Sequence, residues 1–356
     1  MSGSNRNYEP REVWSLNCAK CGRCVVSCPT YLVTKWEHLS PRGRLLLAGY
    51  VENDEELVKS VFSCLTCGIC EVVCPSSVRV TEIIEDVRRK FVEHSLLPER
   101  HALLLERMES SGNPYGVEIE SYEAAEGVDV IYYPGCTSIA KEREIFESTV
   151  RLLDAMGVSY SIEFRYCCGS TALRIGGDDR YARKNFERLR EVVKRTGASK
   201  IIVSCPGCYR TIGRDYRKFG DLGAEVQHMV QFLAEHIDRL RLKREDIRIA
   251  YHDSCHLGRH MGIFEEPRKV LRMAGELMEP ENHGTSSFCC GGGGGAKLSY
   301  REITREVRDE RLRQLRETGA DVVVTSCPYC YRNLKNGDER LNIKDITIFL
   351  AERLER

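Results

Sequence analysis

Residues 198–210 read ASKIIVSCPGCYR, and residues 320–332 read ADVVVTSCPYCYR. Each stretch is a short run of β-prone residues that ends on a CPxC pair, a pattern typical of a buried strand. The two copies are 122 residues apart, and the same interval separates Cys168 from Cys290. A spacing kept this closely indicates one supersecondary unit that occurs twice.

Both units are predicted to alternate strands and helices. The runs VDVIYYPGC (128–136) and IRIAYHDSC (247–255) are expected to be strands that end on a cysteine. The side chains expected on the buried faces of the first unit's helices are Ile145, Thr149, Leu152, Leu153, Met156, Tyr181, Phe186, Leu189 and Val193. This alternation predicts parallel sheets, in which ligands gather where the carboxyl ends of strands meet helix N-termini.

Five cysteines in each unit follow the pattern C…CCG…CPxC, and we call the two copies the first and second CCG units. The first set is Cys136, Cys167, Cys168, Cys205 and Cys208, and the second is Cys255, Cys289, Cys290, Cys327 and Cys330. Each set is expected to converge on one crevice at the strand ends. Five thiolates exceed the four ligands of tetrahedral zinc, which favours iron; one iron cluster with zinc in the other unit is the alternative.

The remaining eight of the 18 cysteines form two copies of CxxCxxCxxxCP. This run binds a cubane [4Fe–4S] cluster in bacterial ferredoxins, where the fourth cysteine of each copy ligates the other cluster. The pattern therefore predicts one cubane on Cys18, Cys21, Cys24 and Cys74 and a second on Cys64, Cys67, Cys70 and Cys28. Zinc also binds CxxC pairs, but it does not require a triplet with a displaced Cys-Pro.

The overall fold class is predicted to be α+β or α/β. A mostly helical two-cluster ferredoxin domain is expected over residues 1–110, with Ile83, Ile84, Val87 and Phe91 on one helix face. Residues 111–127 are rich in turn formers and are expected to be a linker. The two CCG units are expected over residues 128–244 and 245–356.

Charge and hydropathy exclude several classes of protein. The 53 basic and 53 acidic residues cancel, so no nucleic-acid partner is expected. No apolar run approaches the roughly 18 residues of a membrane span, and no secretory pattern is visible at the N-terminus. We expect a reducing, cytoplasmic location, with peripheral attachment to the inner membrane face through a partner as a variant.

Taken together, the paired cubane motifs and the two CCG units resemble the catalytic subunit of heterodisulfide reductase. The resemblance is to the form in which the ferredoxin part and the cysteine-rich part are fused in one chain. The segments YHDSCHLGRHMG, FCCGGGG and TSCPYCYRNL carry this resemblance most specifically. SPRGR and CLTCGICEVVCPS are shared more widely, with iron–sulfur subunits of glycolate, lactate and glycerol-3-phosphate oxidases. The resemblance implies that each five-cysteine set holds a noncubane [4Fe–4S] cluster and that a disulfide is cleaved between the two clusters.

The resemblance also implies partners and leaves alternatives open. The expected partners are a disulfide substrate and an electron-donor subunit, either a membrane cytochrome b-like protein or a flavoprotein. The main alternative is an iron–sulfur electron-transfer subunit of a flavin-dependent glycolate, lactate or glycerol-3-phosphate dehydrogenase. A sensory or scaffold module with structural metals is a third class.

Several further residues carry weaker signals. His256 is a candidate proton donor to product thiols, since a histidine titrates near neutral pH, and His252 is a second candidate; a core or supporting histidine is the alternative for both. Gly291–Gly295 is expected either to bring backbone amides to a cluster or substrate or to form a tight turn. Arg210 and Arg332 follow the CPxC pairs and are expected either to face an anion or to form salt bridges.

Overall fold

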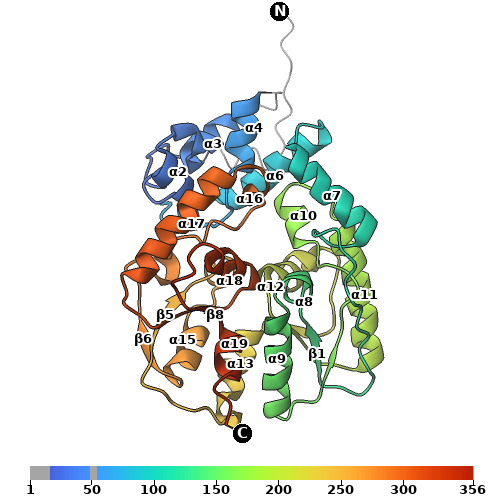
Figure 1. Ribbon diagram of the computed structural model, residues 1–356. Coiled ribbons are helices and arrows are strands. Elements are labelled where there is room, and N and C mark those ends of the chain that lie inside the picture. The colour runs from blue at the N-terminus through green and yellow to red at the C-terminus, as the bar shows by residue number, and fades with distance from the viewer. Residues whose placement is uncertain (1–16, 49–53, 356) are drawn as a thin grey trace, which may run out of the picture.

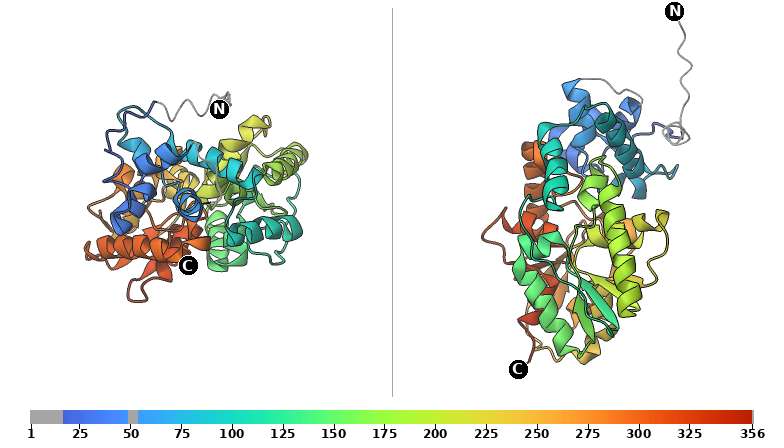
Figure 2. Two further views of the ribbon diagram at one scale, coloured as in Figure 1. Left: turned by 90° about the horizontal axis from the view of Figure 1, so that it is seen from above. Right: turned by 90° about the vertical axis from the view of Figure 1, so that its right-hand side faces the viewer.

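The computed structural model describes residues 17–48 and 54–355. A layer of short helices lies across one end of two α/β units, at the top of the view in Figure 1. The side view in Figure 2 shows the same helical layer above the sheets, with the C-terminus at the opposite end. None of the described helices combines the length and apolar character needed to cross a membrane.

The N-terminal region is helical, as predicted. Its helices are α2 (Pro29–Thr34), η1 (Glu37–Leu39), α3 (Pro41–Leu47), α4 (Glu55–Phe62), α5 (Ile69–Val72), α6 (Val80–Glu93) and α7 (Glu99–Ser111). The helices next to the cysteines are short because each motif places a turn around its thiols. Ile83, Ile84, Val87 and Phe91 of α6 are buried in the core of this region, as their spacing indicates.

The first CCG unit contains a four-stranded parallel sheet with the order β2-β1-β3-β4. Its elements are β1 (Val130–Tyr133), α8 (Cys136–Ala140), α9 (Arg143–Ala155), β2 (Tyr160–Ile162), α10 (Ser170–Arg174), α11 (Arg180–Thr196), β3 (Lys200–Val203), α12 (Pro206–Gly213), η2 (Asp215–Lys218), β4 (Glu225–His228), α13 (Met229–His236) and η3 (Ile237–Arg239). The predicted inward residues of α9 and α11 are buried, except that Tyr181 is partly exposed and its hydroxyl donates to Glu109.

The second CCG unit repeats this topology with the strand order β6-β5-β7-β8. Its elements are β5 (Arg248–His252), α14 (Gly258–Met261), α15 (Glu265–Arg272), β6 (Glu276–Met278), η4 (Gly284–Ser286), α16 (Ala296–Ser299), α17 (Arg301–Arg316), β7 (Val322–Thr325), α18 (Pro328–Lys335), β8 (Ile343–Asp345) and α19 (Ile346–Ala351). The predicted tandem α/β units with parallel sheets are therefore confirmed.

The two units pack against each other through two helix pairs, and each pair contains one helix from each unit. Helix α19, which follows the last strand of the second unit, packs on α9, which follows the first strand of the first unit. Helix α13 packs on α15 in the same manner with the units reversed. Figure 1 shows α9, α19 and α13 together at the lower centre. This pseudo-twofold relation turns the cysteine-bearing strand ends of both units toward the helical layer.

One buried arginine joins the three parts of the molecule. Arg88 of α6 donates from Nη1 to the carbonyls of Arg174 in the first unit and Gly294 in the second, each at 2.7 Å. Its Nη2 donates to the carbonyl of Cys64 in the second ferredoxin motif at 2.7 Å. The guanidinium is fully buried. A single side chain thus supplies hydrogen bonds to backbone groups from all three parts, which would otherwise be unsatisfied.

Residues 112–127 contain no helix or named strand. The segment nevertheless packs on the first unit, because Tyr122 forms an antiparallel bridge with Phe164. The backbone N–H of buried Ala124 also donates to Glu163 at 3.1 Å. This part of the chain lies along the first unit rather than free of it.

Candidate functional site

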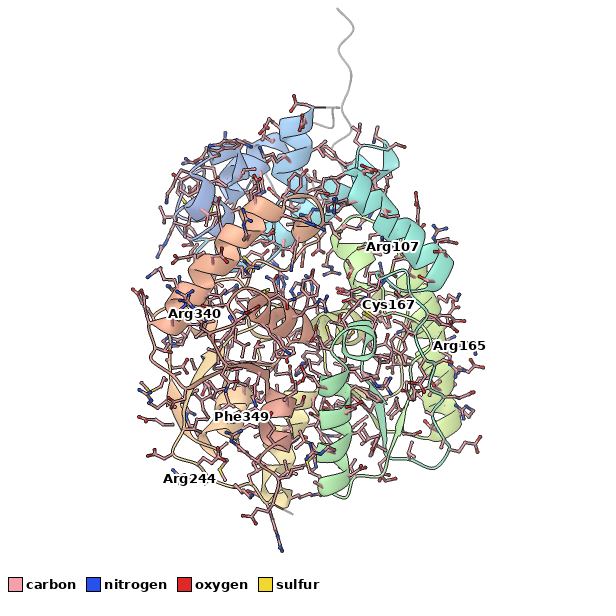
Figure 3. The ribbon with its side chains drawn as sticks, in the orientation of Figure 1. Arg107, Arg165, Cys167, Arg244, Arg340 and Phe349 are labelled. Carbon is pink, nitrogen blue, oxygen red and sulfur yellow. The ribbon has the colours of Figure 1, made fainter. Side chains whose placement is uncertain are left out.

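Nine of the ten CCG cysteines line one cavity of about 280 Å³ between the two units. Strands β1, β3, β5 and β7 each end two or three residues before a cavity cysteine, whereas Cys167 and Cys168 lie in the loop between β2 and α10 and Cys290 lies in the loop between η4 and α16. The cavity thiols are Cys136, Cys167, Cys168, Cys205, Cys208, Cys255, Cys290, Cys327 and Cys330. Figure 3 marks Cys167 in the interior, with Arg107 of α7 above it; both line the cavity.

Within each unit the thiols lie close together. Sγ of Cys136 is 3.7 Å from Sγ of Cys167, and Sγ of Cys168 is 3.4 Å from Sγ of Cys208. In the second unit Sγ of Cys330 is 3.3 Å from Sγ of Cys290. The hydrogen bond from Cys136 holds the pKa of Cys167 well below the usual thiol value. Such a contact favours a thiolate, the form of cysteine that binds metals.

The tenth thiol, Cys289, faces the ferredoxin motifs instead of the cavity. It packs with Cys255 and Cys67 in one buried cluster. Contact with Cys289 lowers the pKa of Cys67 to about 7. The guanidinium of Arg259 in α14 donates to the carbonyl of Cys67 at 2.7 Å, and His260 of the same helix meets the carbonyl of Thr66 at 2.8 Å. The second ferredoxin motif is therefore held directly against the second CCG unit.

Cysteines of the two ferredoxin motifs lie close to one another in the structure. Cys28, the last cysteine of the first motif, lines a small cavity with Cys64, Cys67 and Cys70 of the second. Cys24 lies near Cys18 and Cys74, and burial, followed by these neighbours, raises the pKa of its thiol to about 11. All 18 cysteines are free thiols in the structure.

The surroundings of these thiols fit anionic iron–sulfur clusters. Nη1 of the buried Arg44 is 3.9 Å from Sγ of Cys28. Arg311 is buried beside the Cys289–Cys290 pair; burial lowers the pKa of its guanidinium to about 10, and Asp253, followed by the two cysteines, favours its charged form. Among the described residues, neither arginine forms an ion pair with a carboxylate. A buried cation needs a compensating charge, and a cluster held by thiolates supplies one.

Comparison with known families agrees with this arrangement. Residues 14–78 match the 4Fe-4S dicluster domain, and residues 130–213 and 249–335 match the cysteine-rich CCG domain. The chain is 31% identical to the D subunit of the dihydromethanophenazine:CoB–CoM heterodisulfide reductase of Methanosarcina acetivorans, over 95% of this chain and 93% of that protein. The chain belongs to the heterodisulfide reductase D-type family. It is an iron–sulfur oxidoreductase of that family.

Two other proteins are also similar to this heterodisulfide reductase D-type chain, one in sequence and one in fold. The B subunit of the fumarate reductase (CoM/CoB) of Methanothermobacter marburgensis is 28% identical over 93% of this chain and 70% of that protein. A hypothetical protein from Helicobacter pylori has a similar fold, with a TM-score of 0.58 at 10% identity, over 88% of this chain and 67% of that one. The last comparison supports the fold alone.

The structure separates the alternatives left open for the weaker residues. Arg210 is buried in an ion pair with Glu85 of α6 at 3.2 Å, and Arg332 pairs with Glu142 at 2.6 Å, so both form salt bridges. His256 lines the shared cavity, with Nδ1 3.5 Å from Sγ of Cys255. His252 lies instead in the core behind Cys290.

The glycine run has a role that neither sequence-based alternative described fully. A Cβ atom at Gly294 would lie 2.5 Å from the carbonyl oxygen of Cys64, and one at Gly293 would lie 2.7 Å from that of Leu65. Gly292 also donates its backbone N–H to Sγ of Cys290 at 3.4 Å. Gly293 and Gly294 are glycine because the second ferredoxin motif packs on their backbone, whereas an added Cβ at Gly291, Gly292 or Gly295 would meet Thr304, Tyr329 or Ile175.

Several side chains at the cavity were not singled out in the sequence, among them Tyr329, Tyr115 and Arg174. Tyr329 lies inside the second CPxC pair, and its position within the motif is a signal that points to it. Tyr115 comes from the segment expected to be a linker, and its hydroxyl bonds to that of Thr137 at 2.8 Å. Arg174 of α10 pairs with Glu85 and Asp215. Nothing in the local sequence of Tyr115 or Arg174 indicates that the fold brings them to the thiols.

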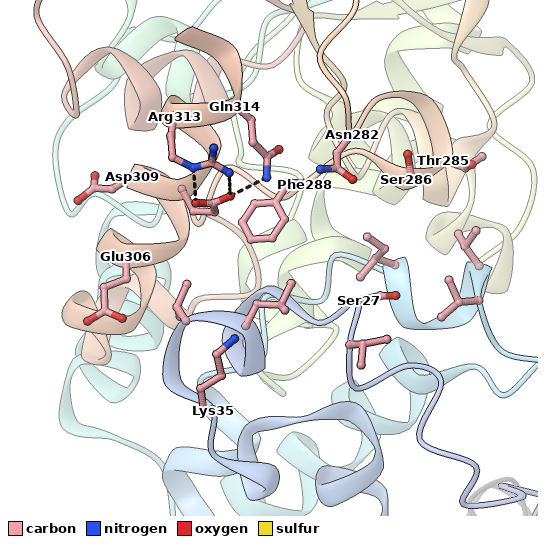
Figure 4. Close-up of a pocket in the computed structure, with 17 residues that line it drawn as sticks. Ser27, Lys35, Asn282, Thr285, Ser286, Phe288, Glu306, Asp309, Arg313 and Gln314 are labelled. Carbon is pink, nitrogen blue, oxygen red and sulfur yellow. Dashed lines mark hydrogen bonds and ion pairs between the residues drawn. The ribbon is translucent and has the colours of Figure 1, made fainter. Parts of the chain in front are cut away.

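A separate groove of about 860 Å³ lies on the outer side of the ferredoxin motifs. Figure 4 shows its two walls: Ser27 and Lys35 come from the N-terminal region, and Glu306, Asp309 and Arg313 come from α17. None of the residues that line the groove is a cysteine. The groove therefore adjoins the ferredoxin motifs without opening on the CCG thiols.

Proposed function

We propose that this chain is a catalytic subunit that reduces a disulfide. Two [4Fe–4S] cubanes, on the two crossed cysteine sets, conduct electrons to two noncubane [4Fe–4S] clusters, one on each five-cysteine set. The domain limits that accompany this proposal are 1–110 for the ferredoxin domain, 111–127 for the linker, and 128–244 and 245–356 for the CCG units. Zinc in place of one noncubane cluster remains the alternative metal content.

The observation that carries the proposal is the shared cavity. Thiols from both five-cysteine sets line it, and the strand ends of both units point toward the helical layer. Disulfide reduction requires two electrons, whereas each cluster transfers one at a time. A site that presents two clusters to one S–S bond supplies both electrons without a further carrier. A linear relay needs no such common cavity.

Packing of the two ferredoxin motifs supports the proposed electron path. Cys21 of the first motif is exposed, whereas Cys67 of the second is buried against Cys289. Electrons are therefore proposed to enter at the first motif, pass to the second, and reach the second CCG unit at the Cys67–Cys289 contact. The electron-donor partner is proposed to dock on the side of the ferredoxin motifs. It is proposed to be a membrane cytochrome b-like protein or a flavoprotein. A cytochrome b-like partner would attach this chain to the inner membrane face.

The overall reaction is one disulfide, two electrons and two protons to two thiols. The S–S bond breaks, and each sulfur takes one electron and one proton. The clusters supply the electrons when bound. His256 is proposed to hold a proton for the leaving thiolate, because it lines the cavity and is partly exposed, so that solvent can reprotonate it.

The test is single-turnover reoxidation. Anaerobically purified protein is reduced with dithionite, freed of excess reductant, and mixed with CoM–CoB heterodisulfide, cystine, glutathione disulfide or a soluble quinone analogue. The expected result is loss of the reduced-cluster signal with one of the disulfides and release of two thiols for every two electrons consumed. Reoxidation by the quinone alone, with no thiol released by any disulfide, would overturn the proposal in favour of an electron-transfer subunit of a dehydrogenase.

A further inference from the structure

The two CCG units differ in the residue that packs behind the second cysteine of the Cys-Cys-Gly sequence. In the first unit Tyr133, at the end of β1, lies beside Cys168, and in the second unit His252, at the end of β5, lies beside Cys290. The registers place the two residues equivalently, since Tyr133 pairs with Val203 of β3 and His252 pairs with Thr325 of β7. The hydroxyl of Tyr133 donates to the carbonyl of Tyr166 at 2.6 Å, so its hydrogen is already engaged in a hydrogen bond.

His252 has a defined tautomer. Nε of Arg311 donates to Nδ1 of His252 at 3.0 Å. A guanidinium has only donors, so Nδ1 must present its lone pair, and the ring proton must be on Nε2. In the first unit the residue equivalent to Arg311 is Leu189, 122 positions earlier, which has no hydrogen-bonding group. This arginine–histidine pair belongs to the second unit alone.

The protonated Nε2 of His252 is buried, and its N–H requires a hydrogen-bond acceptor. His252 is 1% exposed, and its Nε2 has no hydrogen-bond partner among the described residues. A ring nitrogen of His252 and the Sγ atoms of Cys290 and Cys330 all lie within 4.8 Å of one another. A buried N–H without an acceptor is costly, and the sulfur atoms are the nearby acceptors.

We propose that Nε2–H of His252 donates to the Cys290 thiolate of the second CCG unit, and that this contact raises the reduction potential of that cluster above that of the first unit's cluster. The inference rests on the proposed function, because it assumes a cluster on the second set. His252 is a positioning residue here and not a metal ligand. Ligation through Nε2 would leave Nδ1 to hold a proton, and Arg311 occupies the place of the acceptor that such a proton needs.

The direction of the effect follows from charge. A reduced cluster has one more negative charge than the oxidised cluster, so a donor to its sulfur stabilises the reduced form more. Arg311 adds a buried positive charge on the far side of the ring, which strengthens the donor. The cluster next to Cys67 is then the first to hold an electron, and the first unit's cluster is filled from it.

The test is potentiometric EPR titration of the whole, anaerobically prepared protein. His252→Leu removes the donor, and the ratio of reduced to oxidised second-unit cluster at a fixed potential is expected to fall at least tenfold, which is 59 mV for one electron. His252→Gln keeps an N–H and is expected to retain most of the wild-type ratio. Tyr133→Phe, the equivalent change in the first unit, is the matched control and is expected to leave the second-unit ratio unchanged.

A second measurement compares wild type with His252→Leu. Protein labelled with ¹⁵N-histidine is examined by pulsed EPR of the second-unit cluster, and a weak nitrogen coupling, transmitted through a hydrogen bond, is expected in wild type and lost in His252→Leu, which separates it from any coupling to His256 beside Cys255. A strong coupling from directly bonded nitrogen, no coupling, or an unchanged ratio in fully iron-loaded His252→Leu would overturn this inference and leave the proposed function standing. Zinc in the second unit of the wild-type protein would overturn the proposed pair of clusters, and this inference with it.

Discussion

At the scale of single residues, three buried arginines place positive charge in the interior. Arg44, Arg88 and Arg311 are each no more than 1% exposed, and none forms an ion pair with a carboxylate among the described residues. Arg44 and Arg311 lie beside candidate ligand thiols or their supporting histidine. Burial lowers the pKa of Arg311 to about 10, which still leaves it charged at neutral pH. The interior thus contains positive charge placed for anionic clusters.

Individual cysteines should divide between electron input and disulfide binding. Cys21→Ser is expected to remove one cubane and lower turnover with an external donor at least tenfold, while a chemically reduced CCG centre still responds to disulfide. Cys289→Ser is expected to do the reverse. EPR of reduced protein, with and without disulfide, measures both. Equal loss of the disulfide response in the two variants, with circular dichroism unchanged, would contradict this division.

At the scale of elements, the start of α19 provides a pH-dependent contribution to stability. Asp345 caps this helix by accepting from the backbone N–H and hydroxyl of Thr347 at 3.0 and 2.8 Å. Burial raises the pKa of Asp345 from 3.8 to about 7. The folded state therefore retains a proton that the unfolded state has lost, and stability falls by about 1.4 kcal/mol per pH unit as pH rises from 3.8 to 7.

Asp345→Asn should remove this slope, because the amide oxygen accepts the same hydrogen bonds and does not titrate. Anaerobic denaturant unfolding between pH 5.5 and 8 measures the effect, and the variant is expected to exceed wild type in stability at pH 8. The control is Asp321→Asn, since Arg248 lowers the pKa of Asp321 to about 2, below this range. A wild-type slope that persists in Asp345→Asn would contradict the assignment.

The glycine run gives a second test at this scale. Gly294→Ala introduces a Cβ against the carbonyl of Cys64 and is expected to cost about 1–3 kcal/mol more than the cost of its positive φ alone. Gly157→Ala is the matched control, because Gly157 has a similar φ of 64° and nothing within 4 Å of the added atom. Thermal unfolding and the rate of cubane oxidation by the CCG clusters are the measurements. Equal behaviour of the two variants would exclude a role in docking.

Much of this element structure follows from the sequence. The 122-residue interval, the strand runs and the helical stripes predict both α/β units, because local periodicity and repetition determine them. The crossed grouping of Cys28 with Cys64, Cys67 and Cys70 also follows from spacing. The reciprocal packing of α9 on α19 and of α13 on α15 could not be predicted, because it depends on which faces meet after both units have folded. The contacts of Tyr115, Arg174 and Arg88 depend on the same packing.

At the scale of the whole molecule, Arg88 determines how firmly the three parts are joined. Arg88→Met keeps the length of the side chain but leaves the carbonyls of Cys64, Arg174 and Gly294 without their donor. Unfolding free energy is expected to fall by about 3–5 kcal/mol. Limited proteolysis is expected to release the N-terminal region first. Release at the wild-type rate would show that other contacts are sufficient to hold the parts together.

Metal content is the corresponding test of the whole cofactor set. Four clusters of four irons predict about sixteen irons per chain after anaerobic reconstitution. Iron and zinc are measured together by mass spectrometry on the same sample. About eight irons with stoichiometric zinc would assign the CCG units to zinc and remove the catalytic proposal.

Arg88 and the glycine run hold the second ferredoxin motif against the second CCG unit, and this contact has a consequence for the rate of electron transfer. Where redox centres are carried on mobile domains, each electron waits for a diffusive approach, and the rate falls as solvent viscosity rises. Here the backbone at Cys64 and Leu65 is already in contact with residues of the second CCG unit, so the distance between the centres does not depend on such an approach. Transfer between the second cubane and its neighbouring CCG cluster should therefore proceed at the same rate in buffer and in concentrated glycerol, and only the arrival of the donor and of the disulfide should slow.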